Sequence, residues 1–94
     1  GRGQQVEQSP ASLNLQEGES TILNCTYTSS INNLQWYRHY VGKSPTVLFI
    51  IFSDGDEKQQ GRFKTTLNTK KRHSSLSISA PQPGDSATYF CAVE

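Results

Sequence analysis

Residues 85–91 read Asp-Ser-Ala-Thr-Tyr-Phe-Cys, and this stretch constrains the fold more than any other part of the chain. In the two-residue alternation of a β-strand, Tyr89 and Cys91 point to the same side. The only other cysteine is Cys25, and the only tryptophan, Trp36, lies between the two cysteines. This order is typical of two antiparallel sheets joined by one disulfide over a buried tryptophan, with the tyrosine anchored at a corner. The sequence therefore predicts an all-β sandwich with Trp36 and Tyr89 in its core.

The two cysteines favour a disulfide over a metal site. A four-ligand zinc site would need both cysteines and both histidines, and His39 and His73 lack the spacing of a zinc finger. We therefore expect a Cys25–Cys91 disulfide, with no metal and no cofactor. Because such bonds persist in oxidising surroundings, we also expect an extracellular location.

Length and charge restrict the possible partners. At 94 residues the chain has the size of one domain, which we assign to residues 1–94. The formal net charge is only +1 and the basic residues form no single face, so we expect no nucleic acid partner. The chain has no run of about eighteen apolar residues, so we expect this segment to make no direct membrane contact.

Alternating apolar residues between turn residues predict about nine short strands. The first is an edge strand over residues 5–16 that Pro10 interrupts, because proline cannot donate to a sheet. The run from Thr46 to Phe52 is nearly all apolar, so we expect cover on both of its faces and hence a partner. The other strands are expected over residues 20–27, 34–40, 62–68 and 74–80, and over a last segment through Cys91. Residues 58–61 are polar, and no strand is assigned to them.

One sequence motif points to a covalent modification. Asn24-Cys25-Thr26 is an acceptor sequence for an N-linked glycan, and the alternation places Asn24 on the outward side of its strand. The alternative is an unmodified asparagine in a strand. Asn24 is therefore a candidate glycan site.

Several segments together match the pattern of one family. They are residues 5–10, 34–38, 61–63, 76–78 and 85–93. With them, the chain resembles the variable domains of T cell receptor alpha chains over nearly its whole length. The cysteine, tryptophan and tyrosine pattern alone is typical of any variable-type immunoglobulin domain. The Glu-Gln-Ser-Pro and Tyr-Phe-Cys-Ala-Val segments narrow the resemblance to the alpha or the related delta chains.

The resemblance implies a V-type immunoglobulin sandwich with two antiparallel sheets and one disulfide between them. The sequence ends at Glu94, at the start of what would be the third complementarity loop. We therefore expect the final strand of the fold, which a joining segment supplies in this family, to be missing.

The resemblance also implies antigen recognition. The domain would pair with a beta-chain variable domain and contact a peptide or lipid held by a major histocompatibility molecule or a lipid-presenting relative. Ile31 and Phe52 would be apolar anchors among polar loop residues, and residues 69–72 would form a fourth variable turn. The expected antigen-binding residues are Ser29, Ser30, Ile31, Asn32, Asn33, Phe52, Ser53, Asp54, Gly55, Asp56, Ala92, Val93 and Glu94.

A group of apolar and aromatic residues is expected on the outer face of one sheet. Such a group usually marks a protein interface, whereas aromatic residues scattered singly would be ordinary surface. His39 stands where the family usually has a glutamine that bonds its counterpart on the beta chain. The expected interface residues are Tyr37, His39, Pro45, Leu48 and Phe90.

A second function remains open at this point. A V-type adhesion or inhibitory receptor domain would bind through the same sheet face by forming a homodimer. An antibody light-chain variable domain is a third, weaker option. Self-association without any need for a beta chain would favour the adhesion hypothesis.

Arg62 and Asp85 are expected to form an ion pair at the end of the sandwich that lies opposite the loops. Arg38 is a second candidate for the Asp85 carboxylate. The alternative is a set of solvated charges that contribute under about 1 kcal/mol.

No catalytic arrangement is predicted. Ser-His-carboxylate catalysis needs a histidine beside a serine and an acid, but His73 and Ser74 are neighbours in a strand and face opposite sides. Asp54 and Asp56 do not define a site by themselves. We expect a binding protein and not an enzyme.

Overall fold

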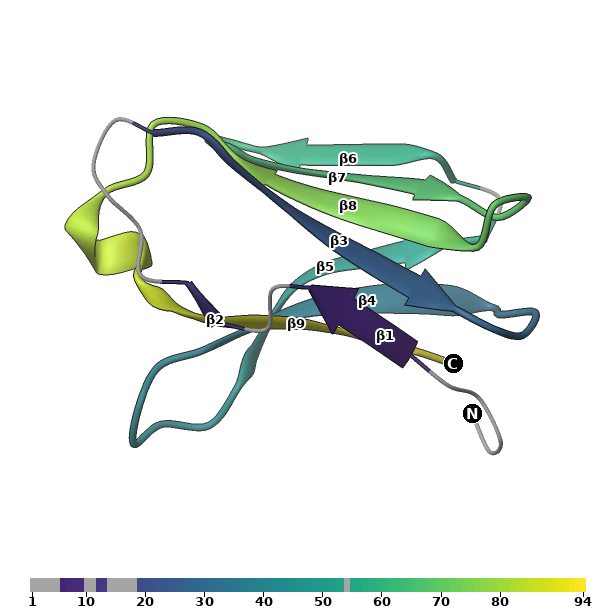
Figure 1. The fold of residues 1–94 in the computed structure, drawn as a ribbon, viewed down its shortest axis with the longest axis horizontal. Helices are drawn as coiled ribbons and strands as arrows, with labels where there is room; N and C mark the ends of the chain where they lie inside the picture. Colours follow the sequence, from purple (N-terminus) through teal and green to yellow (C-terminus); the bar gives the residue numbers. More distant parts are fainter. Residues whose placement is uncertain (1–5, 10–11, 14–18, 54) are drawn as a thin grey trace.

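The computed structural model describes residues 6–9, 12–13, 19–53 and 55–94. Their elements are β1 (Val6–Ser9), β2 (Ser12–Leu13), β3 (Thr21–Tyr27), β4 (Asn33–His39), β5 (Thr46–Phe52), β6 (Glu57–Gln60), β7 (Phe63–Asn68), β8 (His73–Ile78), the short 3-10 helix η1 (Pro83–Asp85) and β9 (Ala87–Val93). The strands form a five-stranded sheet, in the order β1-β3-β8-β7-β6, and a four-stranded sheet, in the order β2-β9-β4-β5. All the strand pairs are antiparallel, and the two sheets stack as layers (Figure 1). The predicted all-β sandwich is confirmed.

The first predicted strand is divided between the two sheets. β1 pairs with β3 in the five-stranded sheet, whereas β2 pairs with β9 in the four-stranded sheet. Pro10, at which we predicted an interruption, lies between them and outside the described residues. The edge segment therefore joins the two layers at their margins.

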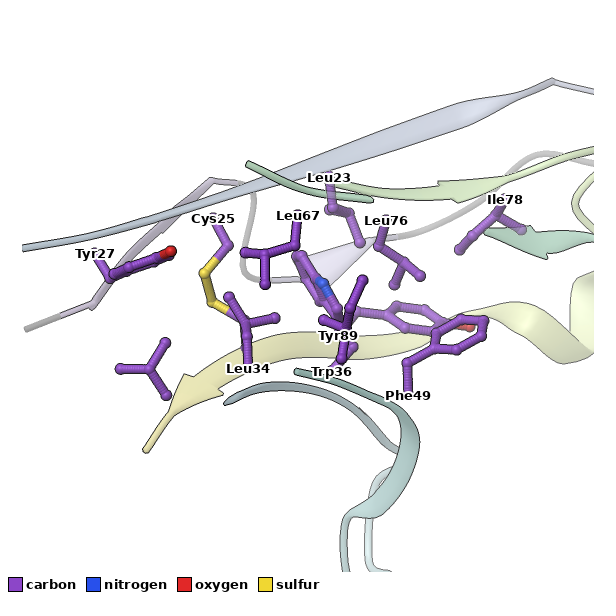
Figure 2. Close-up of a cluster of buried hydrophobic side chains, with 13 residues drawn as sticks. Leu23, Cys25, Tyr27, Leu34, Trp36, Phe49, Leu67, Leu76, Ile78 and Tyr89 are labelled. Carbon is purple, nitrogen blue, oxygen red and sulfur yellow. A yellow bond between two sulfur atoms is a disulfide. The ribbon is translucent and has the colours of Figure 1, made fainter. Parts of the chain in front are cut away.

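The core lies between the layers and follows the predicted alternation. In β3, Leu23 and Cys25 point inward and are fully buried, whereas Ile22 points outward and is 61% exposed. β7 and β8 show the same alternation, which buries Leu67, Leu76 and Ile78. Figure 2 shows the side chains of both sheets meeting in this cluster. The period of two thus sorts side chains into core and surface.

The disulfide and the tryptophan join the two layers. Cys25 of β3 bonds to Cys91 of β9, 66 residues later, as predicted. Trp36 of β4 lies opposite Cys91 in register and is fully buried. Its indole Nε1 donates a hydrogen bond of 3.0 Å to Oγ of Ser74, which lies on β8 in the other sheet. The core therefore contains a polar link between the sheets beside the covalent one.

The structure adds a strand that the sequence analysis did not assign, and it leaves one face of β5 uncovered. Residues 57–60 are not only polar but form strand β6, which pairs with β7 and is exposed along its length. A strand at a sheet edge needs no apolar alternation, so the sequence pattern did not reveal it. The described residues cover only one face of β5, where Phe49 and Ile51 are buried while Val47 and Phe52 stay about half exposed.

Candidate functional site

The connections expected to bind antigen gather at one end of the sandwich. Figure 1 shows the β3–β4, β5–β6 and β7–β8 connections at the same end as the carboxyl end of β9. Asn32 links two of these segments, because its backbone N–H donates to the carbonyl of Glu94 at 2.6 Å and its carbonyl accepts from the N–H of Ser53 at 3.0 Å. The loop between β3 and β4 is thus hydrogen-bonded to both neighbouring segments.

The β7–β8 turn is attached to the same loop through Arg72. Nη1 of Arg72 donates to the backbone carbonyl of Thr28 at 2.8 Å. The backbone carbonyl of Arg72 accepts from the N–H of Tyr27 at 3.2 Å. Arg72 has a φ of 52°, in the left-handed region that side chains other than glycine rarely adopt. These two bonds hold that conformation and connect the turn to the loop end.

The expected antigen-binding residues fall into three groups. Ser30, Asn32, Ser53, Gly55, Asp56 and Glu94 lie outside the strands and are exposed, and Ser29 and Ile31 lie beside them and are partly buried. Asp54 lies outside the described residues. Asn33, Phe52, Ala92 and Val93 lie within β4, β5 and β9 instead of in loops.

Two of these side chains contribute to the core. Val93 is only 9% exposed and belongs to the buried cluster, because β9 continues its alternation to that residue. Ile31 is half-buried and packs against the same cluster. Val93 is therefore a core residue and does not project from the loop end. Ile31 stabilises the loop by packing against the core, instead of projecting towards a ligand as predicted. Phe52 remains 54% exposed.

The outer face of the four-stranded sheet carries apolar and aromatic side chains. Tyr37 and Phe90 lie opposite each other in register and stack with ring centroids 5.2 Å apart. Val47 lies on the other side of Tyr37 in register, so the three residues cross β9, β4 and β5 side by side. Ile50 is 40% exposed and extends this group along β5. We call Tyr37, Val47, Ile50, Phe52 and Phe90 the apolar face.

A β-bulge explains why sequence alternation missed Val47. Trp36 pairs with Phe49 and Tyr37 pairs with Val47, so Leu48 is an extra residue between two register positions. Without the bulge, Val47 would lie on the inward side together with Phe49. Leu48, which we expected at the interface, is partly buried and packs against the core at the margin of the apolar face.

The two other residues expected at the interface lie beside the apolar face. His39 is the last residue of β4, is half-buried and lies opposite Thr88 of β9. Pro45 is exposed and directly precedes β5. The structure therefore brings Tyr37, His39 and Phe90 onto one sheet face, with Pro45 at its edge.

The outer face of the five-stranded sheet has the opposite character. Its strands β7 and β8 carry hydroxyl groups there, including Thr66 and Ser75, whose oxygens are 2.7 Å apart. Asn24 and Thr26 are exposed on β3, and Ile22 is the large apolar side chain among them. The two outer faces of the sandwich thus differ in polarity.

Arg62 and Asp85 pair at the end opposite the loops, near η1. Nη1 and Nη2 of Arg62 approach the two carboxylate oxygens at 2.5 and 3.1 Å. The Asp85 carboxylate also accepts from the backbone N–H of Gln82 at 2.8 Å. Arg38, the second candidate, lies with its guanidinium 5.1 Å above the ring of Tyr40. The bidentate partner of Asp85 is therefore Arg62.

These contacts change the ionisation of two residues. The hydrogen bond from Arg62 is the main reason why the pKa of Asp85 is lowered, and burial only partly opposes it. Tyr89 donates its hydroxyl to the backbone carbonyl of Asp85, which is the expected tyrosine corner. Burial, assisted by the Asp85 charge, raises the pKa of Tyr89 to about 12. The corner thus contains an ionised carboxylate and a neutral phenol at physiological pH.

Replacing this carboxylate is expected to destabilise the protein in a pH-dependent way. We expect Asp85→Asn to lower the free energy of unfolding by about 2 kcal/mol at neutral pH, because Arg62 and the N–H of Gln82 lose their charged acceptor. The folded pKa of Asp85 lies below its ordinary value of 3.8, so its contribution is complete above that pH and is lost as the pH falls through the lowered pKa.

Denaturant unfolding of the native protein and of Asp85→Asn, from neutral pH down to about pH 2, measures this effect. The difference in free energy of unfolding between the native protein and Asp85→Asn should decrease as the pH falls. Glu57→Gln is the control, since the Glu57 carboxylate is exposed and lies 3.5 Å from Lys64. A difference for Asp85→Asn that stays constant with pH would contradict the ion-pair account.

Comparisons with known proteins identify the family. The immunoglobulin V-set domain model matches residues 8–94. Human T cell receptor alpha variable 17 is 48% identical over 91 residues, which cover 97% of this chain and 81% of the relative. Human T cell receptor alpha variable 24 is 53% identical over 88 residues, which cover 93% of this chain and 77% of the relative. The chain belongs to the T cell receptor alpha variable family.

The family extends beyond the human relatives. The mouse T-cell receptor alpha chain V region 2B4 is 50% identical over 91 residues, which cover 96% of this chain and 68% of the relative. T cell receptor alpha variable domains are extracellular modules of a cell-surface receptor for antigen, and they are not enzymes. The predicted family, fold class and absence of catalysis are therefore confirmed by this membership.

His73 and Ser74 face opposite sides of β8, as the strand alternation predicted, and both have structural roles in this T cell receptor alpha variable domain. His73 faces outward, where its Nε2 lies 3.0 Å from Oδ1 of Asn24. Ser74 faces inward, accepts from Trp36 and donates to the carbonyl of Thr66 at 2.7 Å. Over the described ranges, the acidic, histidine and cysteine side chains form no cluster of three or more that could hold a metal ion. In the same part of the chain, no helix has the length and apolarity needed to cross a membrane.

Proposed function

We propose that this domain pairs with a beta-chain variable domain through its apolar face and presents its loop end to a peptide or lipid held by a major histocompatibility-type molecule. It acts by binding alone, as part of a T-cell surface receptor. The observation that carries the pairing is the difference between the two outer sheet faces. One carries exposed apolar and aromatic residues and the other carries hydroxyl groups.

The apolar face has the composition of an interface core. Val47, Ile50 and Phe52 are 49%, 40% and 54% exposed, and they adjoin the stacked Tyr37 and Phe90 rings. Grouped exposed aromatic and aliphatic side chains mark association surfaces in proteins. His39 lies at one end of this face and offers one donor and one acceptor when neutral. A partner that covers this face also accounts for the apolar run of β5.

The loop end has the properties of a recognition surface. Its exposed residues are mainly polar, and hydrogen bonds between backbone groups join the loops to one another. Such links reduce the conformational entropy that binding would otherwise cost. The β7–β8 turn adds Lys70, Lys71 and Arg72 beside the loops.

The alternative is a V-type adhesion domain that forms a homodimer through the same face. The two hypotheses predict different results for the two surfaces. In a receptor for presented antigen, the apolar face serves pairing with the beta chain and the loop end serves ligand binding. In an adhesion domain, the sheet face serves self-association and the loop end has no required role.

Three substitutions in the complete receptor separate these functions. We expect Val47→Asp to weaken pairing with the beta chain at least about tenfold, equivalent to about 1.4 kcal/mol, because it places a charge within the apolar face, directly beside Tyr37. We expect Ser53→Arg to leave pairing unchanged but to reduce binding of the presented ligand, because Ser53 is exposed at the loop end. Surface expression of the paired chains and titration with soluble ligand measure the two effects.

Ile22→Asp is the matched control, because Ile22 is 61% exposed on the outer face of the other sheet. It should change neither pairing nor ligand binding. Pairing that survives Val47→Asp would contradict the proposed interface. Self-association of the native chain that needs no beta chain and is abolished by Val47→Asp, with no effect of Ser53→Arg, would favour the adhesion hypothesis.

A further inference from the structure

We propose that Asn24 carries an N-linked glycan on the outer face of the five-stranded sheet, and that the sugar is attached before the Cys25–Cys91 disulfide closes. Asn24-Cys25-Thr26 is the only Asn-x-Ser/Thr sequence in the chain. The disulfide and the receptor family place the domain in the secretory route where such acceptor sequences are modified.

The geometry around Asn24 accommodates a sugar. Asn24 and Thr26 are both exposed on the same side of β3, two residues apart. The contact with Nε2 of His73, at 3.0 Å, uses the carbonyl oxygen Oδ1 of the Asn24 amide. The amide nitrogen Nδ2, which would carry the sugar, is not part of this contact. A glycan on Nδ2 is therefore compatible with the folded strand.

The position also leaves the binding surfaces free. Asn24 projects from the five-stranded sheet, whereas the apolar face belongs to the four-stranded sheet on the other side of the sandwich. Ile22 flanks Asn24 on the same side and is 61% exposed. The first sugars of a glycan would lie beside this apolar side chain and shield it from other molecules.

The order of events follows from the pairing of β3. In the folded domain, Asn24 lies between Ser9 of β1 and Ser75 of β8, so its strand is paired on both sides. A transferase that must bind the acceptor as a free peptide segment cannot use a strand in this position. Cys25, the middle residue of the acceptor sequence, is also the residue that the disulfide holds in the core. Attachment must therefore precede folding of β3.

Synthesis provides an interval for this step. Cys91 follows Cys25 by 66 residues, which takes roughly 3 to 13 seconds at about 5–20 residues per second. During this interval the correct disulfide cannot form. A membrane-bound oligosaccharyltransferase joins Nδ2 of Asn24 to C1 of a lipid-linked oligosaccharide. The C1–oxygen bond breaks, the lipid diphosphate leaves with the electron pair, and the amide gives up one proton to a base on the transferase.

The test is glycopeptide mass spectrometry on the complete alpha chain, expressed with its beta chain in human cells. Release by peptide N-glycosidase converts the modified asparagine to aspartate, which locates the sugar at Asn24. We expect the modification in the native chain and in Thr26→Ser, and its loss in Asn24→Gln and Thr26→Ala. An unmodified Asn24 in the native chain, or a modified peptide in Thr26→Ala, would overturn the proposal.

A second variant tests the order of attachment. Cys91→Ser keeps the acceptor sequence but prevents the disulfide, so occupancy at Asn24 in newly made chains should equal or exceed that of the native chain. Pulse labelling before export measures it even if the variant fails to fold. A lower occupancy in Cys91→Ser would show that the transferase needs the disulfide-bonded domain, and the proposed order would be wrong.

Discussion

Trp36→Ala is expected to lower the free energy of unfolding by about 3–5 kcal/mol, because it removes a fully buried indole and leaves a cavity between the sheets. Domains of this size are usually stable by only about 5–15 kcal/mol, so the variant should be close to unfolding. Denaturant unfolding followed by far-UV circular dichroism measures the loss. A decrease of less than about 1 kcal/mol would contradict the role of Trp36 as the central core residue.

Two further variants separate the packing of the indole from its hydrogen bond. Trp36→Phe keeps an aromatic ring but removes the N–H that donates to Ser74, so a loss of about 2 kcal/mol is expected. Ser74→Ala leaves the buried indole N–H without its acceptor and should cost about 1–3 kcal/mol. The double variant should lose less than the sum of the two, since each single change breaks the same bond.

The second large effect is expected from removing the disulfide. The Cys25→Ala, Cys91→Ala double variant should lose about 4 kcal/mol, because the bond closes a loop of 66 residues in the unfolded chain. The two sulfur atoms also belong to the buried cluster, so their removal adds a packing loss. We expect a domain that is largely unfolded at body temperature and poorly secreted.

Unfolding with and without a reductant provides the control for this prediction. The native protein should lose stability when the reductant breaks the bond, and the double variant should not respond. An equal stability of the native protein and the double variant would show that the sheets are held by packing alone.

The architecture could be read from a few local features. Cys25, Trp36, Tyr89 and Cys91 predicted two sheets joined by a disulfide, and the structure has that bond and buries both aromatic rings. The period of two sorted most of β3, β7 and β8 correctly into core and surface. This succeeds because the direction of a strand side chain depends on the backbone of its own strand.

The partner of Asp85 illustrates an intermediate case. The sequence offered Arg62 and Arg38 as candidates, and both lie near this carboxylate in the fold. Only Arg62 approaches it with two nitrogen atoms, while Arg38 lies over Tyr40. The choice depends on the positions of three separate segments, which no local pattern encodes.

The class of fold, the disulfide and the family could be predicted from the chain alone, because they depend on residue types at set spacings. The pairing of β6 with β7, the bulge that turns Val47 outward, and the packing of Ile31 and Val93 against the core became visible in the folded molecule. Each of these depends on strand register and on which segments meet across the sandwich. Register is set by contacts between distant residues, so a sequence pattern read along one strand cannot supply it.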